Sequence, residues 1–142
     1  MLAGKRRSQP PAVANRRTAD QIRVLLVDDH PIVREAIARI LRDAGDIAVI
    51  GEVDNGQAAI AAVQSLQPDV ALMDVNMPGM NGIQAAHAIR REASSVKIIG
   101  LSINADDTTR RAMLEAGACA YVLKSGPVEA LIDTIRQCID PA

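Results

Sequence analysis

The chain has 142 residues, of which 49% are hydrophobic and 23% charged, which is typical of one globular domain and excludes an intrinsically disordered chain. Its net charge of −1 is unevenly placed: five Lys and Arg residues give the first 19 residues +5, and the remainder, with 11 basic and 17 acidic residues, carries −6. No apolar run reaches the roughly 18 residues that a membrane-spanning helix needs.

The two cysteines, Cys119 and Cys138, have neither CxxC spacing nor a histidine near them in the sequence, which argues against a zinc site. The start of the chain lacks the apolar segment of a secretory signal. We therefore expect two reduced thiols in a soluble cytoplasmic protein.

Residues 1–20 show no apolar period, contain a Pro-Pro pair and are rich in arginine. We expect a disordered basic arm there. Its charge is suited to contact with nucleic acid or acidic lipid, although a solvated tail or a misassigned start codon explains the same composition. Residues 21–142 are expected to form one folded domain.

Beyond the arm, short apolar runs alternate with amphipathic segments. Most runs are continuous rather than alternating in polarity, which favours strands of a parallel sheet buried on both faces. The expected strands cover residues 22–27, 47–53, 69–75, 96–102 and 119–124. The expected helices lie within residues 31–45, 56–67, 82–93, 106–116 and 127–139, with Ser125 placed to cap the last. Together they predict an α/β fold, a doubly wound (βα)5 sheet.

Ligands of doubly wound sheets bind beyond the carboxyl ends of the strands. Those ends carry Asp28 and Asp29, Asp74, Ser102 and Lys124. Three carboxylates at one edge would repel one another unless a cation joined them, and Mg²⁺ accepts one or two carboxylates together with water and phosphate oxygens. A carboxylate beside Mg²⁺ is a nucleophile for a phosphoryl group, and a hydroxyl and an ammonium are suited to hold the phosphoryl oxygens.

Asp74 ends an apolar run and is followed directly by a turn, in the sequence ALMDVNMPGMNG. The strand is expected to hold the carboxylate rigidly at the edge of the sheet. Pro78, Gly79 and Gly82 are expected to turn the backbone sharply, which leaves room for a metal and a phosphoryl donor.

Four motifs, taken in their order and spacing, resemble the receiver domain of bacterial two-component response regulators. They are DDHP (28–31), MDVNMPGMNG (73–82), LSIN (101–104) and GACAYVLKS (117–125). The DDHP and YVLK segments look most like the NarL/LuxR-type subfamily. The resemblance covers residues from about 22 to 139 and implies a flavodoxin-like, five-stranded parallel sheet with strand order 2-1-3-4-5.

The resemblance implies that Asp74 accepts a phosphoryl group from a sensor histidine kinase. It also implies a Mg²⁺ site, to which Asp29 and Asp74 contribute carboxylates and Asn76 its backbone carbonyl, while Asp28 acts mainly through water. With slow autodephosphorylation, such a protein is a switch more than a conventional enzyme.

Ser102 and Lys124 would then contact the phosphoryl group, and Tyr121 would swing inward as Ser102 moves toward it. Tyr121 alone is equally explained as a half-buried strand residue. Receivers resemble one another in dimerising through the fourth helix and fifth strand, where Arg110 and Arg111 form either a partner surface or a solvated face.

We expect transcriptional output through a DNA-binding domain absent from this chain, as in NarL/LuxR-like regulators, so that DNA is contacted only through that domain. The alternative is a stand-alone receiver acting by protein contact. A remote alternative is a phosphohydrolase with Asp74 as nucleophile, but Asn76 stands where such enzymes usually carry a second Asp. Neither His30 nor His87 is expected to be a metal ligand.

Overall fold

The structure is a computed structural model and describes residues 21–77, 79–103 and 106–140. Every predicted strand and helix is present, in the predicted chain order. The elements are β1 (Ile22–Val27), α1 (Pro31–Asp43), β2 (Ile47–Val53), α2 (Gly56–Leu66), β3 (Val70–Asp74), α3 (Gly82–Glu92), β4 (Lys97–Ser102), α4 (Asp107–Glu115), β5 (Ala120–Leu123) and α5 (Val128–Ile139). The expected basic arm, residues 1–20, lies outside the described residues.

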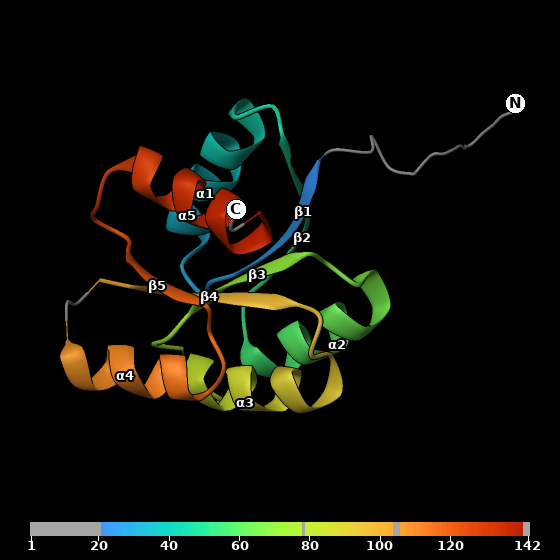
Figure 1. Ribbon diagram of the computed structural model, residues 1–142, viewed down its shortest axis with the longest axis vertical. Coiled ribbons are helices and arrows are strands. Elements are labelled where there is room, and N and C mark those ends of the chain that lie inside the picture. Colours follow the sequence, from blue (N-terminus) through green and yellow to red (C-terminus); the bar gives the residue numbers. More distant parts are fainter. Residues whose placement is uncertain (1–20, 78, 104–105, 141–142) are drawn as a thin grey trace, which may run out of the picture.

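The five strands form one parallel sheet in the order β2-β1-β3-β4-β5, which confirms the predicted (βα)5 fold and its strand order. Helices α1 and α5 cover one face of the sheet, and α2, α3 and α4 cover the other (Figure 1). Within the described part of the chain, no helix is long and apolar enough to cross a bilayer. Because all the strands run the same way, their carboxyl ends meet at one edge of the sheet.

Apolar side chains fill both faces of the sheet. Met73 and Ile98 belong to the core under α2, α3 and α4, whereas their chain neighbours Leu72 and Ile99 belong to the core under α1 and α5. Successive residues of a strand point to opposite faces, so a strand buried on both faces is apolar throughout. This explains the continuous runs in the sequence and holds the ends of β3 and β4 rigidly.

The predicted cap of the last helix is wrong. Helix α5 begins at Val128, and its N-cap is Pro127, which has an extended backbone and makes no side-chain capping hydrogen bond. Ser125 lies too early in the loop to be the N-cap.

The expectation of two reduced thiols is also wrong, because Cys119 and Cys138 form a disulfide in the structure. Cys119 directly precedes β5, and Cys138 lies in the last turn of α5. Their Cα atoms are 6.6 Å apart, although 19 positions separate them in the sequence. A Cα separation of this size is within the range that disulfides bridge, and it arises only when α5 packs beside β5.

Candidate functional site

The polar residues predicted at the strand ends meet at the carboxyl edge of the sheet. Asp74 is the last residue of β3, Asp28 and Asp29 follow β1, Ser102 ends β4 and Lys124 follows β5. We call these five residues the rim. Asp28, Asp74 and Ser102 are buried, so the rim extends into the protein interior.

The turn after β3 holds the carboxylate of Asp74 in place. Its Oδ1 accepts a hydrogen bond from the backbone N–H of Asn76 at 3.0 Å. Gly79 has a φ of +76°, a conformation that glycine adopts readily. A Cβ at Gly82 would collide with the carbonyl oxygen of Asp74. The left-handed backbone of Gly79 agrees with its predicted role in the turn, whereas Gly82 is the first residue of α3 and is needed there for the close approach of Asp74; Pro78 lies outside the described residues.

Asp28 anchors the start of α1 and faces the rim at the same time. Its Oδ1 accepts a hydrogen bond from the backbone N–H of His30 at 2.9 Å, and its carbonyl oxygen accepts one from the guanidinium of Arg34 at 2.7 Å. His30 is the N-cap of α1 and Pro31 its first residue. The carboxylate is therefore fixed through the helix that follows it.

His30 lies closer to the acidic side chains than its sequence position suggested. Its Nδ1 is 3.1 Å from Asp29 Oδ1, 3.2 Å from Asp28 Oδ1 and 4.0 Å from Asp74 Oδ2, while 62% of its side chain is exposed. The sequence did not lead us to expect His30 as a metal ligand. Its place directly after two aspartates at a strand end is the one sequence feature from which this environment could have been predicted.

Lys124 is the cation that joins the two buried carboxylates. Its Nζ lies 2.7 Å from Asp28 Oδ2 and 3.3 Å from Asp74 Oδ2, and only 8% of its side chain is exposed.

The carboxyls of Asp28 and Asp74 have opposite pKa shifts. Burial raises the pKa of Asp28, but the ammonium of Lys124 and the N–H of His30 outweigh it and hold that pKa below its ordinary value. Burial raises the pKa of Asp74; the N–H of Asn76 and the charge of Lys124 offset this only in part, and the charge of Asp28 adds to it. One lysine thus pairs with two buried carboxylates and leaves excess negative charge, which favours binding of a further cation at the rim.

Ser102 and Tyr121 lie on the neighbouring strands β4 and β5. Ser102 pairs with Leu123, and its carbonyl oxygen accepts a hydrogen bond from the N–H of Lys124 at 2.7 Å. Tyr121 pairs with Gly100, is half-buried and packs against the core under α2, α3 and α4. A Cβ at Gly100 would lie 3.2 Å from the tyrosine ring, so the glycine leaves room for the ring.

The arrangement of oxygen atoms fits a divalent cation. Potential ligand atoms of Asp28, Asp29, His30 and Asp74 all lie within 4.8 Å of one another. One buried oxygen of each aspartate accepts no well-directed hydrogen bond from the described residues, although Lys124 contacts two of these oxygens as an ion pair. Such oxygens are costly to bury without a cation, and a hard ion such as Mg²⁺ prefers oxygen ligands.

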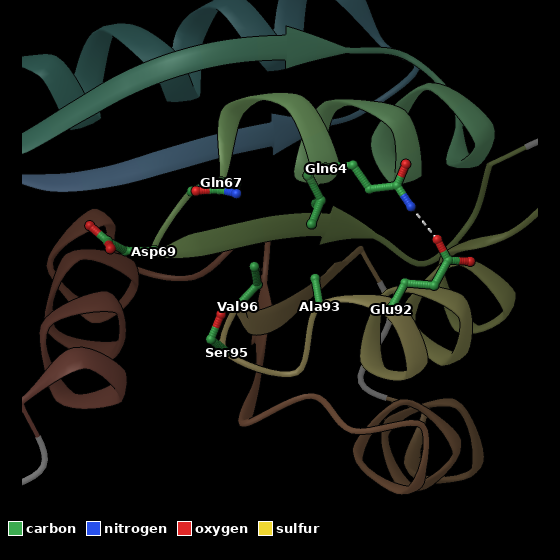
Figure 2. Close-up of a pocket in the computed structure, with 9 residues that line it drawn as sticks. Gln64, Gln67, Asp69, Glu92, Ala93, Ser95 and Val96 are labelled. Carbon is green, nitrogen blue, oxygen red and sulfur yellow. Dashed lines mark hydrogen bonds between the residues drawn. The ribbon is translucent and has the colours of Figure 1, made fainter.

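A polar cleft of about 520 Å³ lies at the opposite edge of the sheet. Figure 2 shows Gln64 and Glu92 hydrogen-bonded across it and Asp69 beside the start of β3. The carboxylate of Asp69 accepts a hydrogen bond from the N–H of Arg23 and so ties β1 to this edge. Because Asp69 and Asp74 lie at opposite ends of β3, the cleft takes no part in the rim.

The sequence matches the response regulator receiver domain family over residues 24–136. The transcriptional regulatory protein LiaR of Bacillus subtilis is 45% identical over 115 residues, which make up 81% of this chain and 54% of LiaR. The chain spans about half the length of the curated relatives it matches.

Two solved structures have the same fold over most of the chain. The signal receiver domain of the response regulator NarL from Mycobacterium tuberculosis has a TM-score of 0.82 at 32% identity, covering 87% of this chain and 99% of that one. The isolated REC domain of RcsB from Salmonella enterica serovar Typhimurium, in the presence of the phosphomimetic BeF3⁻, has a TM-score of 0.76 at 30% identity and covers 83% of this chain and 88% of that one.

Proposed function

The chain belongs to the response regulator receiver domain family of two-component systems, with NarL/LuxR-type regulators among its relatives, and on that premise we propose that Asp74 is its phosphoacceptor. One observation carries this proposal: the buried carboxylate of Asp74 shares the ammonium of Lys124 with Asp28. A carboxylate nucleophile must be held in place and kept ionised. The N–H of Asn76 supports the first requirement, and Lys124 supports the second.

Receiver domains typically bind Mg²⁺ in an acidic pocket, and we propose Asp28, Asp29 and Asp74 for this role, with the backbone carbonyl of Asn76. When bound, Mg²⁺ supplies positive charge that neutralises the rim and polarises the phosphoryl oxygens. The donor set supports this assignment, because the buried carboxylate oxygens that lack well-directed hydrogen bonds among the described residues all lie here.

The chemical step is a phosphoryl transfer to a side chain of this protein. An oxygen of Asp74 attacks the phosphorus of a phosphohistidine, and the bond between phosphorus and the histidine nitrogen breaks as the new bond forms. Lys124 stabilises the charge on the phosphoryl oxygens, and the hydroxyl of Ser102 donates a hydrogen bond to one of them. The product is an aspartyl phosphate, which water hydrolyses slowly.

The phosphorylated rim is proposed to shift a pre-existing equilibrium between two conformations. Ser102 moves toward the phosphoryl group, and the ring of Tyr121 turns inward into the space that Ser102 vacates. Two contacts support this coupling: the hydrogen bond from Lys124 to the carbonyl of Ser102, and the close approach of the tyrosine ring to Gly100.

A receiver domain of a two-component system implies a histidine kinase as partner. We propose that the kinase docks on the exposed side chains of Ile32, Val33 and Val128, which we call the docking patch. They are 83%, 36% and 39% exposed. Ile32 and Val33 lie at the start of α1, which follows Asp28 and Asp29, and Val128 lies at the start of α5, which follows Lys124. Ile32 and Val33 are consecutive in the chain, and contiguous exposed apolar side chains mark interaction surfaces.

The proposed output is transcriptional control in the cytoplasm, through a DNA-binding domain outside this chain. Phosphorylation is proposed to promote homodimerisation through α4 and β5, where Arg110 and Arg111 are exposed. The similarity to LiaR, a transcriptional regulatory protein, supports this output.

Intact-mass measurement after incubation with acetyl phosphate tests the proposal. Wild type should gain one phosphoryl group with Mg²⁺ and none with a chelator, and Asp74→Asn should gain none. Asp43→Asn is the matched control, because Asp43 is exposed and ends α1, a helix that begins beside the rim and runs away from it. Uptake by Asp74→Asn at the wild-type rate contradicts the assignment, as does a wild type that accepts phosphate from neither acetyl phosphate nor a phosphorylated kinase.

A further inference from the structure

The disulfide between Cys119 and Cys138 links the start of the outermost strand of the sheet to the last helix. Cys119 leads into β5, which is the edge strand, and Cys138 lies near the end of α5. The chain between them contains β5, Lys124 and almost all of α5. The bond therefore limits how far α5 moves against the strand that leads into the rim.

The fold does not depend on this bond for a core. Aliphatic side chains fill both faces of the sheet, and the domain is large enough to bury a core without a covalent staple. Disulfides that stabilise small domains belong to oxidising compartments, whereas those of cytoplasmic proteins are usually transient, catalytic or redox-sensing. The expectation of a redox-sensing bond rests on the proposed cytoplasmic location, whereas the contacts of the two cysteines are independent of it.

Contacts other than the disulfide also hold the segments that carry the two cysteines. The N–H of Cys119 donates to the carbonyl of Ile98 at 2.8 Å, which fixes it to β4. The end of α5 is held by Arg136, whose guanidinium donates to Asp46 at 2.8 Å and 2.9 Å. Two thiols held near one another by the fold re-form their bond more readily than free thiols, because proximity replaces a bimolecular encounter.

We propose that Cys119 and Cys138 are a reversible redox site that reacts with dithiol reductants and small-molecule disulfides and braces α5 against β5 only when oxidised. Cys119 is exposed as a residue and Cys138 is half-buried, so we expect a reductant to attack the sulfur of Cys119.

Reduction proceeds by thiol–disulfide exchange. A thiolate of the reductant attacks the sulfur of Cys119, and the electron pair of the broken bond leaves on Cys138, which takes up a proton. The second thiol of the reductant then displaces Cys119 from the mixed disulfide. The protein gains two electrons and two protons, and the reductant becomes a disulfide. A small-molecule disulfide reverses both steps.

The test uses the full chain, whose two cysteines are its only thiols. The protein is equilibrated without oxygen in mixtures of reduced and oxidised dithiothreitol, quenched in acid, alkylated and weighed intact. The disulfide form carries no alkyl group and the dithiol form carries two. These two forms should interconvert in one reversible transition as the dithiothreitol ratio changes, and the protein should remain monomeric. A bond that opens only in urea, or thiols that fail to re-form the bond within one chain, overturns the proposal.

Single variants identify the attacked sulfur. With oxidised glutathione, Cys138→Ser, which retains Cys119, should form a mixed disulfide severalfold faster than Cys119→Ser. Equal or reversed rates contradict the exchange order given above.

Hydrogen exchange of the wild type tests the brace without any substitution. Reduction should speed exchange of the last turn of α5 and leave α3, on the other face of the sheet, unchanged. Identical exchange of α5 in the two redox states overturns the brace.

Discussion

Lys124→Met removes the ammonium from between two buried carboxylates and keeps a side chain of similar length. The two contacts, at 2.7 Å to Asp28 and 3.3 Å to Asp74, each correspond to a gross attraction of about 5 to 6 kcal/mol at an effective dielectric constant of about 20. Burying the lysine offsets part of this, and removing one partner of a buried pair typically costs about 3 to 5 kcal/mol. We expect a loss of that size near neutral pH without Mg²⁺, out of a total stability of about 5 to 15 kcal/mol.

The loss should depend on pH in a defined direction. In the wild type the pKa of Asp28 is lowered, so its stabilising effect is present above the ordinary carboxyl pKa of 3.8 and is lost as the pH falls through the lowered pKa. Lys124 lowers the pKa of both Asp28 and Asp74, so its removal should raise both pKa values, and ionising these carboxyls should then cost more stability as the pH rises above 3.8. The difference between wild type and variant should therefore shrink as the pH falls from about 7 to about 3.

Urea unfolding in the presence of a chelator measures this difference across the pH range. Lys97→Met is the matched control, since Lys97 is exposed at the start of β4, and its stability should change by less than about 0.5 kcal/mol. Equal losses for the two variants, or a Lys124→Met loss that does not vary with pH, would refute the argument that Lys124 neutralises the rim.

Four further outcomes follow from the same geometry. Asp74→Asn removes a carboxyl whose pKa burial raises, so without metal it should be more stable than wild type near neutral pH, with the gain vanishing below pH 3.8; urea midpoints at both pH values test this. The initial rate of phosphoryl uptake from acetyl phosphate at low, fixed Mg²⁺ should fall as the pH drops through that raised pKa, because only the ionised carboxylate is nucleophilic; a rate independent of pH contradicts this. Gly82→Ala forces a Cβ against the carbonyl of Asp74 and should lower the unfolding free energy by about 1 to 3 kcal/mol in urea unfolding; an unchanged free energy contradicts the close approach. Reducing the bond between Cys119 and Cys138 should lower the unfolding free energy by about 3 kcal/mol, as urea unfolding with and without a dithiol shows; no change contradicts the bond.

Much of the rim follows from the sequence because parallel strands place their carboxyl ends at one edge. The continuous apolar runs ending near Val27 and Asp74 indicate strands buried on both faces, and the buried cores under both faces confirm this. The order of the strands, by contrast, came from the resemblance to receiver domains. Apolar runs alone do not distinguish which strands are neighbours.

The features that the sequence did not reveal depend on tertiary packing. The imidazole of His30 approaches Asp74 only because β1 and β3 are adjacent in the sheet. Cys119 and Cys138 meet only because α5 packs next to β5. Distances between elements that are far apart in the chain are not encoded in local spacing, so pattern reasoning treated both cysteines as separate thiols.

The central claim is that Asp74 carries the phosphoryl group, and chemical mapping tests it most directly. Wild type incubated with acetyl phosphate and Mg²⁺ is treated with borohydride, which reduces an acyl phosphate to an alcohol, and is then digested and sequenced by mass spectrometry. The account predicts homoserine at position 74 and unchanged aspartates at positions 28 and 29. Homoserine at either of those positions, or none anywhere in protein that has gained a phosphoryl group, would contradict it.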